Sequence, residues 1–388
     1  MKKRKIIRAS TIPWSLEAFC NGLLRELSER YEVVALSSPG ELLDVVENRE
    51  GVRCERIEMA RHISPLKDLV SLFRILRLFW KEKPDIVHSM TPKAGLLCMM
   101  AGWLLRVPVR IHTFTGLVFP SATGLKRHLL MLTDRITCLC ATHVIPEGEG
   151  VKHDMEVYHI TRKPLRVLGH GNVRGVDMEY YSRRPEVMLL ADKFRDDNVF
   201  TFVFVGRVAR DKGIDELCDA FSRLNKVHTA TRLIIVGPDE SELDPISSSA
   251  RDIIDHHPSV QAVGMQREDA LLAYYAIGDC FVLPSYREGF PNTVLEAGAM
   301  SLPCIVTDIN GSREIVIEGE NGLIVPPRDS EALCQAMLRM VEQTEKREQM
   351  SGNARRLVEE RFEQSYVRRC LYSFYEEAEE NTLQSKRR

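Results

Sequence analysis

The stretch that decides the fold is Val282-Leu-Pro-Ser-Tyr-Arg-Glu288-Gly289-Phe290-Pro291-Asn292-Thr293-Val-Leu-Glu296-Ala-Gly-Ala-Met. Its first residues close a short apolar run that predicts a buried strand. A loop with Glu288 follows, and then a helix for which we expect Asn292 or Thr293 as the N-cap. Glu296 falls about one turn into that helix. The pattern predicts free backbone N–H groups and two carboxylates together beyond the carboxyl end of a strand.

This grouping suits a phosphate flanked by sugars. Amides at the start of a helix bind the anion, and each carboxylate can accept hydrogen bonds from hydroxyl groups. Two glutamates separated by seven residues would by themselves indicate only surface carboxylates near a helix start. Together with the strand, the Pro-Ser pair and Glu-Gly-Phe-Pro they form a rarer pattern, which we interpret as a binding site.

A second loop carries two cations. In Val203-Phe-Val-Gly206-Arg207-Val-Ala-Arg-Asp-Lys212-Gly213, a predicted strand ends in a glycine and the chain then enters a helix. Arg207 can hold a diphosphate in a bidentate manner, and Lys212 adds a point charge. Alone, both would be ordinary loop residues. Beside the acidic loop, we interpret them as a site for a diphosphate leaving group.

The two loops resemble the signature of the family-four retaining glycosyltransferases, which have the GT-B fold: two facing Rossmann-like domains with parallel sheets and a central cleft. The resemblance implies that Glu288 lies by the donor sugar, that Glu296 binds the ribose, and that Arg207 and Lys212 bind the pyrophosphate. It further implies a backbone that faces sugar and phosphate at Gly289, Phe290, Pro291, Asn292 and Thr293, and a nucleobase held near Met265 and Gln266. For Met265 and Gln266, a plain strand-to-helix turn is the alternative.

Loops of the first half are expected to line the acceptor side. His112, in Ile111-His112-Thr113-Phe-Thr-Gly116, is expected at the cleft, where it would contact a donor-sugar hydroxyl or assist proton transfer. An isolated histidine is as often structural, and many members of the family carry the histidine directly before the glycine, where this chain has Thr115. We also expect acceptor contacts from Ser15, Lys93 and Thr113, with Lys93 facing an acceptor phosphate.

Short apolar strands that alternate with helices predict an α/β fold with parallel sheets. The expected strands of the first half are 5–9, 32–36, 84–88, 109–113 and 143–145, and its expected helices include 16–30, 66–82 and 95–105. The expected strands of the second half are 200–205, 232–236, 260–263, 280–283, 304–307 and 322–325. The glycine-rich segment 169–177 predicts a linker. We place an acceptor domain at 1–172 and a donor domain at 173–365, with a last helix, 366–388, that crosses back to the first domain.

Several familiar site patterns are absent from the sequence. It contains no Asp-x-Asp, no Gly-x-x-x-x-Gly-Lys loop and no complete dinucleotide fingerprint. We therefore expect chemistry that needs no metal ion and no cofactor, with the charge of the leaving group met by Arg207, Lys212 and backbone amides. The ten cysteines form no Cys-x-x-Cys pair and indicate buried thiols in a reducing compartment.

Charge is unevenly distributed along the chain. Residues 1–172 carry 26 Lys and Arg against 18 Asp and Glu, whereas the whole chain has a net charge of −2. A basic first half indicates an anionic partner, but no nucleic-acid-binding motif accompanies it. The stretches 69–83 and 124–135 are basic and amphipathic. They either press on an anionic bilayer or are ordinary sheet-covering helices with solvated cations. We expect a cytoplasmic protein, with peripheral contact at the inner face of the membrane as an option.

The residues and the resemblance together predict a retaining transferase that moves a sugar from a nucleotide diphosphate, expected to be UDP, to a glycan precursor in bacterial surface polysaccharide or glycan synthesis. Similar bacterial enzymes act on undecaprenyl-diphosphate-linked sugars. One alternative is a non-hydrolysing UDP-sugar 2-epimerase, which shares the architecture and needs no acceptor. The other is a non-catalytic module that binds nucleotide-sugar or nucleic acid.

Overall fold

The computed structural model describes residues 3–60 and 62–387, and it divides into two units. Unit 1 comprises Met1–Gly175 and Ser365–Arg388, and unit 2 comprises Val176–Gln364. The sequence-based boundary at 172/173 lies three residues from this division. Residues from Ser365 onward, which form the last helix, are grouped with unit 1. Residues 1, 2 and 388, at the ends of the predicted domains, lie outside the described residues.

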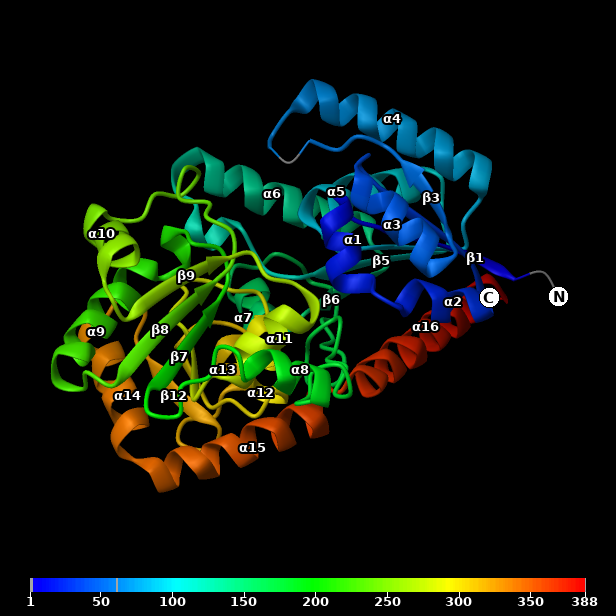
Figure 1. Cartoon of the computed structure of the whole chain (residues 1–388). Coiled ribbons are helices and arrows are strands. Elements are labelled where there is room, and N and C mark those ends of the chain that lie inside the picture. Colours follow the sequence, from blue (N-terminus) through cyan, green and yellow to red (C-terminus); the bar gives the residue numbers. More distant parts are fainter. Residues whose placement is uncertain (1–2, 61, 388) are drawn as a thin grey trace. The chain divides into compact units, whose positions relative to one another are not determined.

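Unit 1 is a parallel six-stranded sheet in the order β3-β2-β1-β4-β5-β6, covered by helices (Figure 1). Its strands are β1 Arg4–Ala9, β2 Tyr31–Ser37, β3 Arg53–Arg56, β4 Ile86–Ser89, β5 Val109–Phe114 and β6 His143–Pro146. Its helices are α1 Pro13–Cys20, α2 Leu23–Arg30, α3 Glu41–Glu50, α4 Pro65–Glu82, α5 Pro92–Leu104, η1 Phe119–Ser121, α6 Gly124–Cys140, α7 Glu149–Val157 and α16 Gln364–Arg387.

Unit 2 repeats the same plan with a parallel sheet in the order β12-β11-β10-β7-β8-β9. Its strands are β7 Phe200–Val205, β8 Thr231–Val236, β9 Val260–Gly264, β10 Cys280–Leu283, β11 Cys304–Thr307 and β12 Gly322–Val325. Its helices are α8 Pro185–Ala191, η2 Arg210–Lys212, α9 Ile214–Val227, α10 Ser248–His256, α11 Glu268–Ala276, α12 Asn292–Ala299, α13 Ser312–Ile315, α14 Ser330–Glu342 and α15 Thr344–Phe362.

The strand order fixes where ligands can bind. In each unit the chain builds three strands outward from the first, then returns to the other side of that first strand for the fourth. The loops after the first and fourth strands therefore diverge at the carboxyl edge of the sheet, which is where open α/β sheets bind ligands. In unit 2 this reversal lies between β7 and β10, and in unit 1 between β1 and β4.

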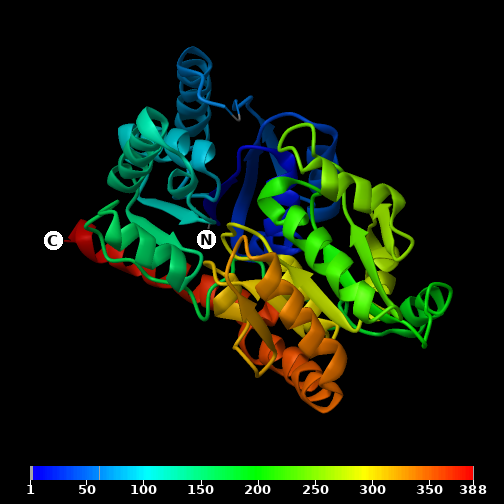
Figure 2. The ribbon, with the colours of Figure 1, turned by 90° about the vertical axis from the view of Figure 1, so that its left-hand side faces the viewer.

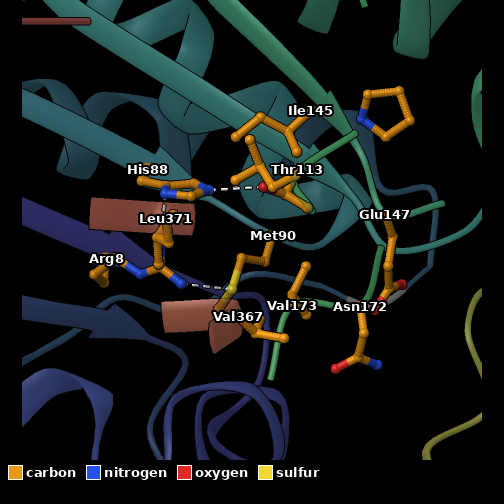
Figure 3. Close-up of a pocket in the computed structure, with 12 residues that line it drawn as sticks. Arg8, His88, Met90, Thr113, Ile145, Glu147, Asn172, Val173, Val367 and Leu371 are labelled. Carbon is orange, nitrogen blue, oxygen red and sulfur yellow. Dashed lines mark hydrogen bonds between the residues drawn. The ribbon is translucent and has the colours of Figure 1, made fainter. Parts of the chain in front are cut away.

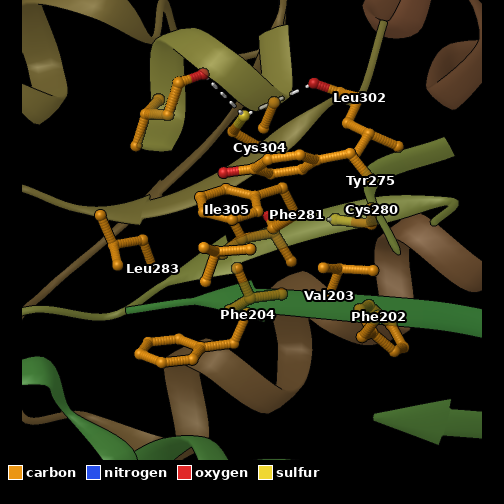
Figure 4. Close-up of a cluster of buried hydrophobic side chains, with 14 of the residues drawn as sticks. Phe202, Val203, Phe204, Tyr275, Cys280, Phe281, Leu283, Leu302, Cys304 and Ile305 are labelled. Carbon is orange, nitrogen blue, oxygen red and sulfur yellow. Dashed lines mark hydrogen bonds between the residues drawn. The ribbon is translucent and has the colours of Figure 1, made fainter. Parts of the chain in front are cut away.

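The core of unit 2 explains why its strands are continuous apolar runs. Phe202, Phe204, Phe281 and Ile305 are fully buried, and the ring of Tyr275 of α11 lies 5.9 Å from that of Phe281 (Figure 4). Helices cover both faces of a parallel sheet, so each strand is buried on both sides. This burial rigidly positions the loops that leave the strands.

Three local predictions differ from the structure. The helix expected at 16–30 is two helices, because Gly22 adopts φ +73° and breaks it after Cys20. Strand β3 was not predicted, since its sequence Arg-Cys-Glu-Arg is mostly charged and it lies at the edge of its sheet. The N-cap of α12 is Pro291 rather than Asn292 or Thr293, so the helix begins one or two residues earlier than expected.

No helix among residues 3–60 and 62–387 is both long and apolar enough to cross a bilayer. All ten cysteines lie in the described part of the chain as free thiols, and nine of them are buried.

Candidate functional site

The two predicted loops of unit 2 leave the sheet at its reversal point and lie directly against each other. Gly213 makes this possible: it adopts φ +70°, and a Cβ there would lie 2.1 Å from the carbonyl oxygen of Pro284. The amide of Tyr286 donates to the carbonyl of Asp211 over 2.9 Å. The loop after β7 is thus bonded to the loop after β10 through its backbone.

This contact brings together two of the predicted residues. Lys212 Nζ lies 2.6 Å from Glu288 Oε1, and the two side chains are only 16% and 15% exposed. A largely buried pair neutralises itself, whereas either member alone would be a costly buried charge.

Arg207 lies beside the pair in a net of acidic side chains. Its guanidinium contacts Glu240 at 2.9 Å and Asp211 at 3.2 Å, and Arg287 reaches Asp211 over 3.6 Å. Burial alone would lower the pKa of Arg207, but the hydrogen bond to Glu240 and the charge of Asp211 outweigh it and raise that pKa. The side chain remains 40% exposed, so the guanidinium is accessible from solvent.

Helix α12 presents its N-terminus next to this loop. Its N-cap is a proline, whose side chain offers no acceptor to the amides of the first turn, and the amide of Val294 donates to the carbonyl oxygen of Pro291 over 3.1 Å. The loop before α12 packs closely on Gly311, where a Cβ would lie only 2.4 Å from the carbonyl oxygen of Gly289. Glu296 is buried in the helix and accepts a hydrogen bond from the hydroxyl of Tyr275 over 3.1 Å.

The remaining donor-side prediction lies further along the sheet. Met265 and Gln266 follow β9, the edge strand, two strands from β7. Met265 is exposed, and Gln266 Nε2 donates to the carbonyl of Val263 over 2.8 Å. Their role in holding a nucleobase stays a prediction.

The first-half residues predicted from sequence are mostly buried within unit 1. His112 in β5 is 1% exposed, its Nδ1 lies 2.8 Å from Ser89 Oγ, and its ring packs on Gly95, where a Cβ would lie 2.3 Å away. Burial lowers the pKa of His112 to about 3. The ring is therefore neutral at physiological pH and does not reach the surface. Its predicted contact with a donor sugar would need a local rearrangement.

The three predicted acceptor-side residues have internal partners or are buried. Lys93 pairs with Asp68 at 2.5 Å, so an acceptor phosphate would have to displace that carboxylate. Thr113 is buried and bonds His88 Nε2 over 2.8 Å, and Ser15 is buried in α1. The acceptor contacts predicted for these three residues stay predictions.

Comparison with known proteins decides the family. Residues 190–357 match the glycosyl transferases group 1, and residues 16–171 match the glycosyl transferase 4-like domain. The capsular polysaccharide biosynthesis glycosyltransferase CapM of Staphylococcus aureus is 31% identical over 379 residues, which cover 97% of both chains. The chain belongs to the group 1 glycosyltransferases.

A second relative of this glycosyltransferase is the UDP-Gal:alpha-D-GlcNAc-diphosphoundecaprenol alpha-1,3-galactosyltransferase of Escherichia coli, 28% identical over 292 residues and 73% of both chains. Among solved structures, Anabaena HepE in complex with UDP aligns with a TM-score of 0.80 at 18% identity, covering 97% of this chain and 100% of that one. That likeness concerns the fold alone. It confirms the predicted GT-B class of two Rossmann-like units with parallel sheets.

Sequence reasoning missed a buried polar cluster in unit 1 of the glycosyltransferase (Figure 3). Arg8 in β1 is 2% exposed, and its Nη1 donates to Tyr375 Oη of α16 over 2.7 Å and to His88 Nδ1 over 2.5 Å. Since guanidinium can only donate, His88 Nδ1 accepts and its Nε2 carries the proton toward Thr113. No carboxylate among the described residues forms an ion pair with Arg8. The hydrogen bond from Arg8 to Tyr375 therefore connects β1 to α16, the C-terminal helix.

Among residues 3–60 and 62–387, no group of three or more His, Cys, Asp or Glu side chains is arranged to hold a metal ion.

The burial of His112 predicts a pH dependence of stability. Its native pKa is about 3 and its unfolded value about 6.5, so below pH 6.5 the unfolded chain binds a proton that the native ring refuses. The free energy of unfolding should fall as pH decreases from 6.5, by at most about 1.4 kcal/mol per pH unit for this residue. In His112→Asn the decrease should be shallower. Urea denaturation between pH 7 and 5.5 measures it.

The matched control is His153→Asn, because His153 is an exposed histidine of α7. Its pH dependence should equal that of the wild type. If His112→Asn also shows the wild-type slope, the ring titrates freely in the folded protein and the burial argument is wrong.

Proposed function

We propose that this glycosyltransferase transfers a sugar from a UDP-sugar to a lipid-diphosphate-linked glycan in the assembly of a bacterial surface polysaccharide, with retention of anomeric configuration and without a metal ion. The full-length similarity to CapM supports the polysaccharide, and the name of the Escherichia coli relative supports the donor nucleotide and the acceptor class. The observation that carries the proposal is the pairing of Lys212 with Glu288 at the β7–β10 reversal, next to Arg207.

The charges at this point suit a diphosphate leaving group. As the glycosidic bond breaks, negative charge builds on the diphosphate, and a site must stabilise it more strongly in the transition state than before. Lys212 and Arg207 are both paired with carboxylates, and the loop after β10, which leads into α12, is hydrogen-bonded to their loop. If phosphate oxygens replaced the carboxylates at Lys212 and Arg207, these two cations would neutralise the charge on the leaving group without Mg²⁺ or Mn²⁺.

The two glutamates would then have separate tasks. Glu288, released from Lys212, would lie next to the ring that acquires positive charge, while Glu296 would accept from the ribose hydroxyls. For the transfer we propose a front-face displacement. The bond between the anomeric carbon and the phosphate oxygen breaks, the acceptor oxygen bonds to that carbon from the same face, and the acceptor proton passes to the departing phosphate.

Such an acceptor would bring the protein to a membrane. Nucleotide-sugars are cytoplasmic substrates, so we propose a cytoplasmic enzyme that works in peripheral contact with the inner membrane face. The two rival functions differ in what they need: an epimerase requires no acceptor, and a binding module turns over nothing. The matches to the glycosyltransferase families and to CapM favour the transferase over both.

The direct test measures UDP release from a panel of UDP-sugars with and without a polyprenyl-diphosphate-linked sugar. Release should depend on the acceptor and should persist in EDTA, because the cations and amides replace a metal. Isomerised sugar without acceptor would support the epimerase, and no turnover would support the binding module. Turnover that EDTA abolishes and Mg²⁺ or Mn²⁺ restores would contradict metal independence.

Substitution of the two glutamates should separate their roles. Glu296→Gln should raise the donor KM about tenfold with a small change in kcat, because the ribose contact is equal in ground and transition states. Glu288→Gln should lower kcat by roughly a hundredfold while UDP still binds, since Lys212 remains. Steady-state kinetics and UDP calorimetry measure both, with Glu331→Gln as the exposed control. Loss of UDP binding in Glu288→Gln but not in Glu296→Gln would mean the roles are reversed.

A further inference from the structure

Helix α4 is apolar on two opposite faces. One face is buried in unit 1 through Ser71, Ile75, Leu78 and Phe79. Large apolar side chains that are between 52% and 83% exposed follow the opposite side of the same helix: Leu66, Leu69, Val70, Phe73 and Trp80. Spacings of three, four, seven and fourteen residues from Leu66 place these side chains along one stripe of a helix with 3.6 residues per turn. We call these five residues the α4 stripe.

A sheet-covering helix needs only one apolar face, so the stripe calls for another explanation. In both views of the molecule, α4 lies on the outside of unit 1 (Figures 1 and 2). Helix α5 packs between α4 and α6, and α6 also carries exposed leucines, at positions 125, 129, 132 and 139. Exposed apolar area therefore extends over more than one helix of unit 1.

The exposed charges on α4 itself are all of one sign. Lys67, Arg74, Arg77 and Lys81 are exposed on α4, and within the described residues none of them forms an ion pair. The two acids of the helix are occupied elsewhere: Asp68 pairs with Lys93, and Glu82 pairs with Lys5 and Arg53. The outer surface of α4 thus combines large apolar side chains with unpaired cations and no free carboxylate.

These properties select among possible occupants. A second copy packed on α4 through a two-fold axis would bring the same cations close to each other. A bilayer rich in anionic lipid instead supplies negative headgroups for the cations and acyl chains for the stripe, with an aromatic residue such as Trp80 at the interface. We propose that the outer face of α4 is a membrane-docking surface for anionic lipid, with Leu66, Phe73 and Trp80 as its principal apolar contacts.

This inference stands on the surface of α4 and goes beyond the proposed reaction, since it does not depend on which sugar or acceptor is used. The test is co-sedimentation of the full chain with vesicles of equal parts phosphatidylglycerol and phosphatidylcholine, and with vesicles of phosphatidylcholine alone. The wild type should bind the anionic vesicles at least about tenfold more tightly than the neutral ones, and added salt should weaken this binding.

Three variants locate the surface. Leu66→Ser, Phe73→Ser and Trp80→Ser combined should reduce binding about tenfold or more. A control triple of equally exposed residues of unit 2, namely Leu189→Ser, Val227→Ser and Leu243→Ser, should bind as the wild type does. Arg74→Gln, Arg77→Gln and Lys81→Gln combined should remove the preference for anionic vesicles. All substituted residues are exposed, so the variants should fold, and circular dichroism checks that they do.

Two results would overturn the proposal. In the first, the wild type binds vesicles and the stripe variant binds them equally, so that another surface is responsible. In the second, the wild type ignores vesicles and the stripe variant changes the mass measured by light scattering, so that a second copy covers α4. Sugar transfer to a water-soluble short-chain acceptor should be unchanged in the stripe variant. A wild type that lacks this transfer would contradict the proposed function and leave the docking result intact.

Discussion

The close approach of Gly213 to Pro284 is the constraint on which the site of unit 2 depends. Without a Cβ at position 213, the loop after β7 lies against the loop after β10, and Lys212 meets Glu288. Any other residue would clash with a backbone oxygen and would also be strained at φ +70°. The strand order makes these two loops neighbours, and the glycine brings them close enough for a largely buried ion pair.

That ion pair gives the site a specific electrostatic state. Each cation that the proposal assigns to the diphosphate already has a carboxylate partner, so the free protein does not bury an unpaired charge. Ligand binding then becomes an exchange of anions at Lys212 and Arg207. Such exchange favours a ligand that brings several negative oxygens at once, and it leaves Glu288 available to hydroxyl groups only after the diphosphate has arrived.

The two units share one topology and differ in what fills the reversal point. In unit 2 it carries a cationic loop and an acidic loop, whereas in unit 1 the corresponding strands β1 and β4 contribute Arg8 and His88 to a buried network with Tyr375. The first arrangement suits a polar ligand, and the second joins the C-terminal helix to the sheet. The same topology therefore carries different side chains at its two reversal points: charged loops in unit 2 and a buried hydrogen-bond network in unit 1.

Most of unit 2 could be predicted from its sequence because its signals are local. Each strand is an apolar run, and each site loop follows its strand directly, so the pairing of the loops follows from the parallel topology. Contacts between distant residues could not be predicted: Tyr375 lies 367 residues from Arg8, and no local pattern connects them. His112 was expected at a cleft because it follows a strand, but its burial depends on Gly95 in another element. The sequence left open whether the stretch 69–83 meets a bilayer or only covers the sheet, because periodicity cannot tell which apolar side chains of a helix are covered, and only the structure shows which side chains of α4 stay exposed.

The measurement that tests the central claim most directly is UDP affinity, by titration calorimetry, in Arg207→Ala and in Arg223→Ala. Both arginines belong to unit 2, are 40% and 43% exposed, and pair with two carboxylates each, so they differ mainly in position. The account predicts that Arg207→Ala weakens UDP binding about ten- to a hundredfold, the scale of a lost charge-assisted hydrogen bond, and that Arg223→Ala leaves it unchanged. Equal affinities in both variants and the wild type would show that the diphosphate does not bind at the β7–β10 reversal.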